Sequence, residues 1–253
     1  MTQQAEYTRA FPDRWGKADL HIHTHLSDGG PAPEQVVEHV ARRTDLDVIA
    51  VTDHNRIAGG LRARDYCERR GLALQVVVGE EVATADGHLL ALYISDQIAP
   101  NQPIEDTIAA VHEQGGLAVV SHPFDLISSS LLGRGSRGWT LEELALLPLD
   151  GMEALNGSLV QHGANVRAML LAHSLGFTAT GSSDAHHLAV IGRAHTCFPG
   201  HTAEDLRRAI LAGAAVPGGA SWQWRNYLSW VSGCLIPRTL RRTCAAVRAL
   251  APA

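Results

Sequence analysis

The sequence predicts an α/β protein in which one sheet closes into a barrel. Short runs rich in aliphatic and β-branched residues alternate with amphipathic helical patterns along most of the 253-residue chain. Several helical patterns stop at a glycine, as at Gly71, Gly115 and Gly176, where glycine commonly ends a helix. This repeated strand–helix order is typical of parallel strands joined by right-handed crossovers. About seven such units in one domain favour a closed barrel over an open sheet.

Hydrophobic periodicity places the strands. The runs at 46–51 and 117–120 are almost wholly apolar, which is typical of buried strands. A hairpin is expected at Asp86-Gly87, because this dipeptide is a strong signal for a two-residue turn. The expected strands cover residues 18–22, 46–51, 74–78, 81–85, 88–94, 117–120, 151–155, 177–180 and 194–198.

The helices are predicted where apolar residues recur every three to four positions instead of every second one. In the first of them Val36, Val37 and Val40 share one side behind a proline at the start. Residues 124–138 are rich in Ser, Gly and Arg and are expected to form a long loop. The expected helices cover residues 33–43, 60–70, 104–114, 141–146, 159–175 and 203–211.

Composition sets the broad class. Hydrophobic residues make up 45% of the chain and charged residues 19%, which is ordinary for a globular α/β protein. The net charge of -5 argues against general affinity for nucleic acid. We assign residues 1–217 to one barrel domain with a polar N-terminal arm, and residues 218–253 to a helical extension rich in Trp and Arg.

The sequence also predicts a cytoplasmic location. Its cysteines, Cys67, Cys197, Cys234 and Cys244, are scattered and form no Cys-x-x-Cys pair. Reduced thiols are therefore expected, rather than a disulfide framework or a thiolate zinc site. The N-terminal stretch lacks an apolar signal core, and no segment is long and apolar enough to cross a bilayer.

The most distinctive stretch is DLHIHTHLSDGG, residues 19–30. His21 and His23 alternate with apolar residues at the end of the first expected strand, and residues two apart in a strand share a face. Two imidazoles on one face, followed by Asp28 in a glycine-rich turn, are typical of the start of a metal site. Taken alone, the stretch leaves a solvated run of histidines open as the alternative.

Comparable polar residues follow strand after strand. In α/β barrels the carboxyl ends of the strands form the functional rim. One polar residue at a strand end usually caps a helix, but six such places, each with a histidine or a carboxylate, indicate a shared site. Imidazole and carboxylate ligands suit Zn, Mn and Fe. The candidate ligands are His21, His23, Asp28, His54, Glu81, His88, His122, Asp184 and His186.

This set exceeds what one tetrahedral ion requires, so two or three clustered divalent ions are expected. Clustered ions favour phosphoester hydrolysis. They lower the pKa of a bound water and stabilise charge on the attacking and leaving oxygens.

The ordered motifs resemble those of the PHP (polymerase and histidinol phosphatase) family of metal-dependent phosphoesterases. In chain order they are HxHTxxSDG, TDHN, GEE, DGHLL, SHP and GSSDAH. The resemblance runs from about Asp19 to His186 and on through Arg193. It implies a distorted seven-stranded β/α (TIM-like) barrel of PHP type, usually with a trinuclear metal centre.

The resemblance also implies three ligand groups. They are His21, His23 and Asp184 for the first ion, His88 and His122 for the second, and Asp28, His54 and His186 for the third. Glu81 would bridge the first two ions, because the family pattern Gly-x-Glu selects it over Glu80 on the other strand face. A metal-bridging hydroxide would attack phosphorus, with Asp184 or His186 assisting proton transfer.

Neighbouring residues have weaker claims. His25 is expected on the rim rather than among the ligands. Asp19 and Asp53 precede ligands and would orient imidazoles, with a loop cap as an equal alternative for Asp53.

Phosphate recognition would fall to residues beside the motifs. Arg134 and Arg137 lie in the loop after SHP, and Arg193 follows GSSDAH. A guanidinium offers a planar fork for phosphate oxygens, although solvated loop positions are the alternative for the first two. Asn156, after the strand at 151–155, would contact substrate or cap the next helix. The expected partner is a small phosphorylated substrate or a nucleotide, with nucleic acid only as a short substrate.

The C-terminal extension holds Trp222, Trp224 and Trp230, and from residue 221 on it has five arginines and no acid. A pair of helices packed on the barrel is the favoured interpretation. A surface for anionic membrane lipid or RNA is the alternative.

Two other functions remain open at this point. One is a metal-binding regulatory or accessory protein whose site is structural or degenerate. The other is an amidohydrolase, but such a site usually requires a lysine ligand, and the sole lysine, Lys17, precedes the first strand.

Overall fold

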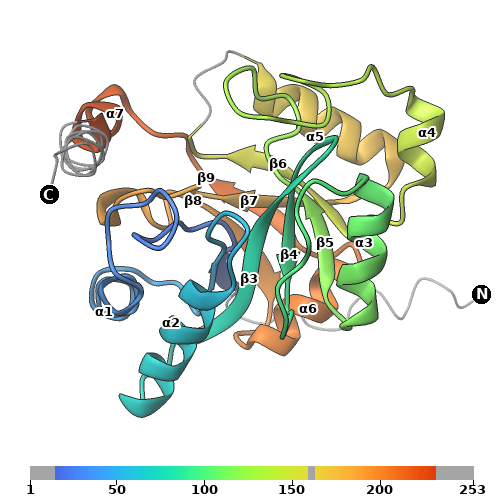
Figure 1. The fold of residues 1–253 in the computed structure, drawn as a ribbon. Coiled ribbons are helices and arrows are strands. Elements are labelled where there is room, and N and C mark those ends of the chain that lie inside the picture. The colour runs from blue at the N-terminus through green and yellow to red at the C-terminus, as the bar shows by residue number, and fades with distance from the viewer. Residues whose placement is uncertain (1–14, 159–162, 232–253) are drawn as a thin grey trace, which may run out of the picture.

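The computed structural model describes residues 15–158 and 163–231. Its strands are β1 (Trp15–Asp19), β2 (Val48–Val51), β3 (Gln75–Thr84), β4 (Gly87–Leu92), β5 (Leu117–Val120), β6 (Gly151–Asn156), β7 (Thr178–Ser182), β8 (Ala194–Pro199) and β9 (Val216–Gly219). Its helices are α1 (Pro33–Arg43), α2 (Ala58–Arg69), α3 (Ile104–Glu113), α4 (Leu141–Leu146), α5 (Ala164–Leu175), the short η1 (Leu188–Val190), α6 (Ala203–Leu211) and α7 (Trp224–Trp230). The strands form the centre of the molecule, with α1 and α2 on one side and α3 on the other (Figure 1).

All strands belong to one sheet in the order β7-β6-β5-β4-β3-β2-β1-β8-β9. The sheet curves until its far strands meet: Gly181 N donates to Thr196 Oγ1 at 3.0 Å, and that hydroxyl donates to Gly181 O at 2.8 Å. Just beyond, Ala185 N donates to His21 O and His23 N donates to Ala185 O. The barrel is therefore nearly closed, and the predicted α/β barrel is confirmed.

Within residues 15–158 and 163–231 the barrel has nine strands, whereas the family resemblance implied seven. The expected strands at 74–78 and 81–85 are one continuous strand, β3. β9 has the sequence VPGG, whose proline and glycines carry no strand pattern, so the sequence does not predict it. The sheet is also mixed, because β4 runs antiparallel to β3 and β5, and β8 runs antiparallel to β1 and β9.

The helices lie close to their expected positions. α1, α4 and α6 have the predicted bounds, because each begins at a clear signal. Thr140 and Thr202 cap α4 and α6, and Pro33 opens α1. α5 begins at Ala164, directly after Gly163 with a φ of 83°, and the predicted start at residues 159–162 lies outside the described residues.

The barrel interior changes from apolar to polar along the strands. On β3 the inward residues run from Val77 to Glu81, and on the antiparallel β4 they run back from Leu92 through Leu90 to His88. Below the polar end, side chains from the strands and α6 form one buried cluster: Ala18, Leu20, Val48, Ala50, Val77, Leu90, Leu92, Leu117, Val119, Phe198, Leu206, Ala209, Ile210 and Ala215. The packed apolar cluster thus fixes the strands that carry the polar side chains at the other end.

Within the described part of the chain, no helix combines the length and the apolar character that crossing a membrane requires.

Candidate metal centre

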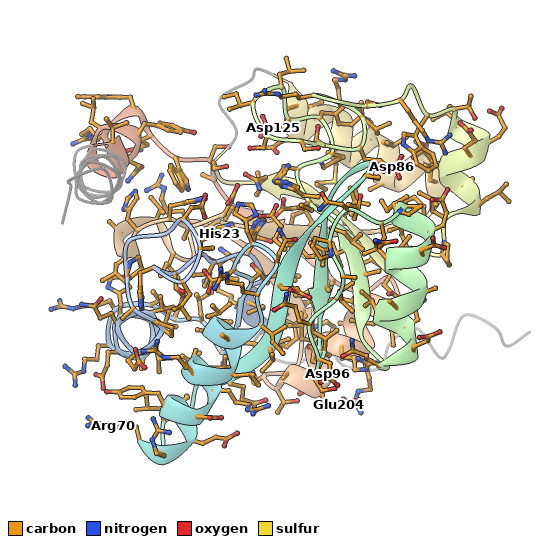
Figure 2. The ribbon with its side chains drawn as sticks, viewed as in Figure 1. His23, Arg70, Asp86, Asp96, Asp125 and Glu204 are labelled. Atoms are coloured by element: carbon orange, nitrogen blue, oxygen red, sulfur yellow. The ribbon has the colours of Figure 1, made fainter. Side chains whose placement is uncertain are left out.

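The predicted ligands converge at the polar end of the barrel. Figure 2 shows His23, Asp86 and Asp125 towards this end, and Asp96 and Glu204 at the opposite one. The histidines and carboxylates come from the segments after β1, β2, β5 and β7 and from the β3–β4 hairpin. His88 lies near the start of its strand, and it still reaches the rim because β4 is antiparallel to β3.

Glu81 lies at the middle of the cluster. Ala83 is paired with His88 across the hairpin, so Glu81, two residues before Ala83, shares a face with His88. Glu81 Oε1 lies 2.9 Å from His88 Nδ1 and 2.9 Å from His122 Nε2. Its other oxygen, Oε2, lies 3.0 Å from His54 Nδ1. One carboxylate therefore contacts imidazoles on both sides, as a bridging ligand requires.

A second group surrounds the two histidines of the first motif. The Nε2 atoms of His21 and His23 are 3.0 Å apart, and Asp184 Oδ1 lies 3.6 Å from the first and 3.3 Å from the second. All three side chains are buried or nearly so. The predicted first ligand group is thus brought together by segments more than 160 residues apart in the chain.

The third group lies nearer the opening. Asp28 Oδ2 is 3.2 Å from His186 Nε2 and 3.5 Å from His54 Nε2. His186 Nδ1 donates to the backbone oxygen of Asp184 at 3.0 Å, which directs its Nε2 into the cluster. His23 joins this group through Nδ1, 3.4 Å from Asp28 Oδ1.

The spacing and chemistry of these donors fit divalent ions. Ligands about 2.1 Å from a shared ion are about 3.0 to 3.4 Å from one another in octahedral or tetrahedral geometry. Four groups of three donors, each group within 4.8 Å, occur among the described residues. Mixed imidazole and carboxylate donors favour Zn, Mn or Fe over Ca.

The cluster is strongly charged. Burial alone would lower the pKa of His54, but the carboxylates of Glu81 and Asp28 outweigh it and raise that pKa to about 11. Burial opposes the ionisation of Glu81, yet His54, His88 and His21 hold its pKa well below the usual range. Buried carboxylates need compensating positive charge, which bound cations would supply.

Two donors have unusual backbone conformations. His122 has a φ of 27° and Asp184 a φ of 50°, in the left-handed region that non-glycine residues rarely adopt. Such conformations cost on the order of 1–3 kcal/mol each and persist at functional sites where the surroundings fix them.

A carboxylate that the sequence analysis did not identify supports the cluster from below. Glu153 on β6 is fully buried, and its Oε1 accepts from His21 Nδ1 at 3.1 Å. Its Oε2 accepts from His122 N and from Asn156 Nδ2, both at 2.8 Å. Holding the Nδ1 proton of His21 in this way leaves Nε2 free to face the other donors. The available signal was an acidic residue inside the otherwise apolar strand Gly151–Leu155.

The predicted substrate residues lie elsewhere. Arg134 donates to Ile127 O, and Arg137 stacks on Trp139 beside Asp86. Arg193 Nη2 contacts Ser221 O at 3.4 Å. None of these arginines lines the cavity above the cluster. Their role in phosphate binding stays a prediction.

Asn156 is fully buried beneath the donors and does not line the cavity either. Its Nδ2 lies 3.3 Å from Asp184 Oδ2, so its visible role is to support that carboxylate.

The residues with weaker claims also have clear positions. His25 is exposed, and Glu80 points away from the cluster to accept from Ile98 N. Asp19 and Asp53 orient backbone and hydroxyl groups instead of imidazoles: Asp19 accepts from Ser183 N and Asp53 from Thr24 N.

The cavity above the donors has a volume of about 260 Å³. Its upper wall is partly aromatic, because Trp222 and Tyr227 line it together with Ile127 from the loop after β5. The sequence predicts both aromatic residues in a helical extension beginning at residue 218, and this division stays a prediction. Residue 218 lies within β9, which pairs with β8.

The barrel and the donor cluster together define a metal-dependent phosphoesterase. The sequence profile of the PHP domain matches residues 19–147, about half of the chain, and a PHP-associated profile matches residues 162–215. The chain belongs to the PHP domain family.

Individual proteins are similar over different lengths. An uncharacterized protein of Methanocaldococcus jannaschii is 36% identical over 150 residues, which cover 55% of this chain and 81% of that protein. The 5'-3' exoribonuclease Rnm of Escherichia coli is 42% identical over 66 residues, 26% of this chain and 22% of the enzyme. A two-domain protein from Bacteroides vulgatus, containing a predicted PHP-like metal-dependent phosphoesterase, shares the fold with a TM-score of 0.66 and 21% identity, covering 83% of this chain and 68% of that one.

Proposed function

We propose that this chain hydrolyses a phosphomonoester, or a phosphodiester of a nucleotide or short oligonucleotide, with two or three divalent ions held by the cluster. The observation that carries the proposal is the arrangement of eight histidines and carboxylates around Glu81, most of which line the floor of one cavity. The similarity to an enzyme named as an exoribonuclease supports phosphodiesters as one substrate class, although it covers only 22% of that enzyme.

Each ligand group would hold one ion. His21, His23 and Asp184 would bind the first, Glu81 with His88 and His122 the second, and Asp28 with His54 and His186 the third. Zn, Mn or Fe ions bound there would lower the pKa of a water and neutralise charge on the phosphate oxygens.

The protein's own side chains would orient the metal ligands and transfer protons. Asn156 and Ser158 donate to Asp184 Oδ2, so they fix the carboxylate beside the first ligand group. His186 Nδ1 donates to the backbone oxygen of Asp184, so Nε2 is the ring atom that would bind the third ion. We assign proton transfer to this Nε2 when the third ion is absent, or to Asp184.

The test uses the full chain loaded with Mn or Zn and a panel of aryl phosphates, nucleotides, sugar phosphates and short oligonucleotides. Hydrolysis of part of the panel is expected. His21→Ala should lower kcat/KM by on the order of 100-fold or more, because it removes a ligand shared by two groups. His25→Ala, at an exposed position in the same loop, is the matched control and should retain the parent activity.

If the protein retains its metals yet hydrolyses nothing on the panel, this result would contradict the proposed enzymatic activity. It would favour a regulatory or accessory metal-binding role. The amidohydrolase alternative lacks support, since Lys17 forms an ion pair with Asp45 at 2.6 Å and lies outside the donor groups.

A further inference from the structure

The cavity has two unlike halves. Its floor consists of the imidazoles and carboxylates of the cluster, whereas Trp222, Tyr227 and Ile127 supply flat or aliphatic surfaces above them. A phosphate would bind at the floor, so the rest of a substrate would lie against these three side chains. We call them the aromatic wall.

The wall is held in place by hydrogen bonds. Trp222 is only 7% exposed, and its Nε1 donates to Ser183 O at 2.9 Å. The rings of Trp222 and Tyr227 have centroids 5.2 Å apart and planes inclined by 46°. A rigid pair of rings can bind a flat group with little loss of side-chain entropy.

The wall is also tied to the donors. The Tyr227 hydroxyl donates to Ser158 O at 2.7 Å, and Ser158 Oγ donates to Asp184 Oδ2 at 2.7 Å. This short path fixes the distance between the ring of Tyr227 and the first ligand group. A substrate must therefore fit both at once.

The two rings lie beyond the parts of the chain that match the family. The profiles cover residues 19–147 and 162–215, while Trp222 and Tyr227 lie between β9 and the middle of α7. In Figure 1, α7 lies to one side of the barrel, and the connection from β9 leads to it. Two of the three side chains of the wall thus come from a segment that neither profile covers, and Ile127 comes from a matched one.

We propose that the aromatic wall is a subsite for a flat aromatic ring in the alcohol part of the phosphoester. This inference rests on the proposed phosphoesterase function and narrows its substrate class. An alkyl or polyol group would not stack on Tyr227 and Trp222, and hydroxyls facing Ile127 would lose hydrogen bonds to water.

The experiment compares benzyl phosphate with butyl phosphate on the metal-loaded full chain. Both release an unconjugated alcohol, so the ratio of their kcat/KM values reports binding of the ring instead of leaving-group chemistry. The parent should prefer benzyl phosphate by about tenfold or more, as expected for stacking on an aromatic side chain. Tyr227→Leu should reduce this ratio about tenfold, whereas Tyr227→Phe keeps the ring and should largely preserve it.

Trp224→Leu is the control within the same helix. Trp224 is 69% exposed and does not line the cavity, so this variant should keep the parent ratio. Thermal melting and metal content verify that each variant is folded and loaded. Equal kcat/KM for the two esters in the parent, or a ratio unchanged in Tyr227→Leu, would overturn the subsite and leave the proposed function intact.

Failure of the proposed function gives a different result, namely no hydrolysis of either ester or of any member of the phosphoester panel. In that case the dissociation constants of benzylphosphonate and butylphosphonate decide the subsite without turnover. Tighter binding of the benzyl compound, lost in Tyr227→Leu, supports it, and equal binding overturns it.

Discussion

The two carboxylate oxygens of Glu81 contact different histidines of the donor cluster. Oε1 contacts His88 and His122, and Oε2 contacts His54 and, at 3.3 Å, His21. No other carboxylate in the described residues contacts as many of the predicted ligands. Placing it required the alternation of β3, which directs Glu81 inward and Glu80 outward. The family pattern Gly-x-Glu selected Glu81 over Glu80, and strand alternation required only that the two lie on opposite faces.

Glu153→Gln tests the support beneath the cluster. The carboxylate accepts the Nδ1 proton of His21, and a glutamine of the same shape would accept it more weakly and without charge. We expect the affinity for the first ion to fall by about 10–100-fold, as for other residues that orient a ligating histidine. The measurement is a calorimetric titration of metal into protein from which a chelator has removed the ions.

Glu142→Gln, at an exposed position on α4, is the matched control and should bind metal as the parent does. Unchanged metal affinity in Glu153→Gln would show that Glu153 only fills the barrel. Urea unfolding of both variants separates a loss of affinity from a loss of stability.

The sequence predicted the nine donors but not their support. The donors lie in short motifs that can be identified from the spacing of neighbouring residues, as in His-x-His. Glu153 acquires its role only through a partner 132 positions away, and Trp222 through one 39 positions away. Neither pairing leaves a local pattern, so both became visible only in the fold.

At the scale of elements, the β3–β4 hairpin carries the central carboxylate and one histidine of the cluster. The Asp86-Gly87 signal predicted the hairpin, but its two turn residues are Ala85 and Asp86, one position earlier. Gly87 begins β4 and has a φ of 137°, which an L side chain rarely adopts. The antiparallel course of β4 then brings the start of this strand, with His88, to the rim. Donors therefore follow the carboxyl ends of β1, β2, β5 and β7 as predicted, whereas His88 lies at the amino end of β4.

α6 closes the apolar end of the barrel, and its N-terminal cap should matter for stability. Thr202 Oγ1 accepts from Asp205 N at 3.0 Å, and Asp205 Oδ2 accepts from Thr202 N at 3.1 Å. Thr202→Ala removes the first bond and should lower the free energy of unfolding by about 1 kcal/mol. Thr202→Ser retains the hydroxyl and should restore most of it. Urea denaturation measures both, and equal destabilisation by Ala and Ser would contradict the capping role.

β9 shows where prediction by element failed. Its four residues include proline and two glycines, and two of the four are exposed. Their strand conformation is imposed by pairing with β8 and not by their own propensity. The same pairing leads the chain back towards the rim, where Trp222 joins the cavity.

At the scale of the whole molecule, the cluster connects segments from residue 21 to residue 186. Closure of the barrel depends on the same region, since His21 O and His23 N both bond to Ala185 next to Asp184. Ions bound by these donors would therefore link the first strand segment to the segment after β7. The sequence predicted the barrel from repetition, but the meeting of its ends depends on long-range pairing that repetition alone does not specify.

Chelation should consequently lower the stability of the entire barrel. Ions that bind only the folded state stabilise it by about 2.7 kcal/mol at a free concentration 100 times the dissociation constant. In a chain of this size, that corresponds to a rise in Tm of about 5–10 °C for one site. We expect treatment with a chelator to lower Tm by at least this amount, and Mn or Zn to restore it, as measured by differential scanning calorimetry. His21→Ala should show a much smaller metal-dependent shift, because it takes a donor from two of the groups. A parent protein that binds metal stoichiometrically but melts at the same temperature after chelation would show that the ions do not join the two ends of the barrel.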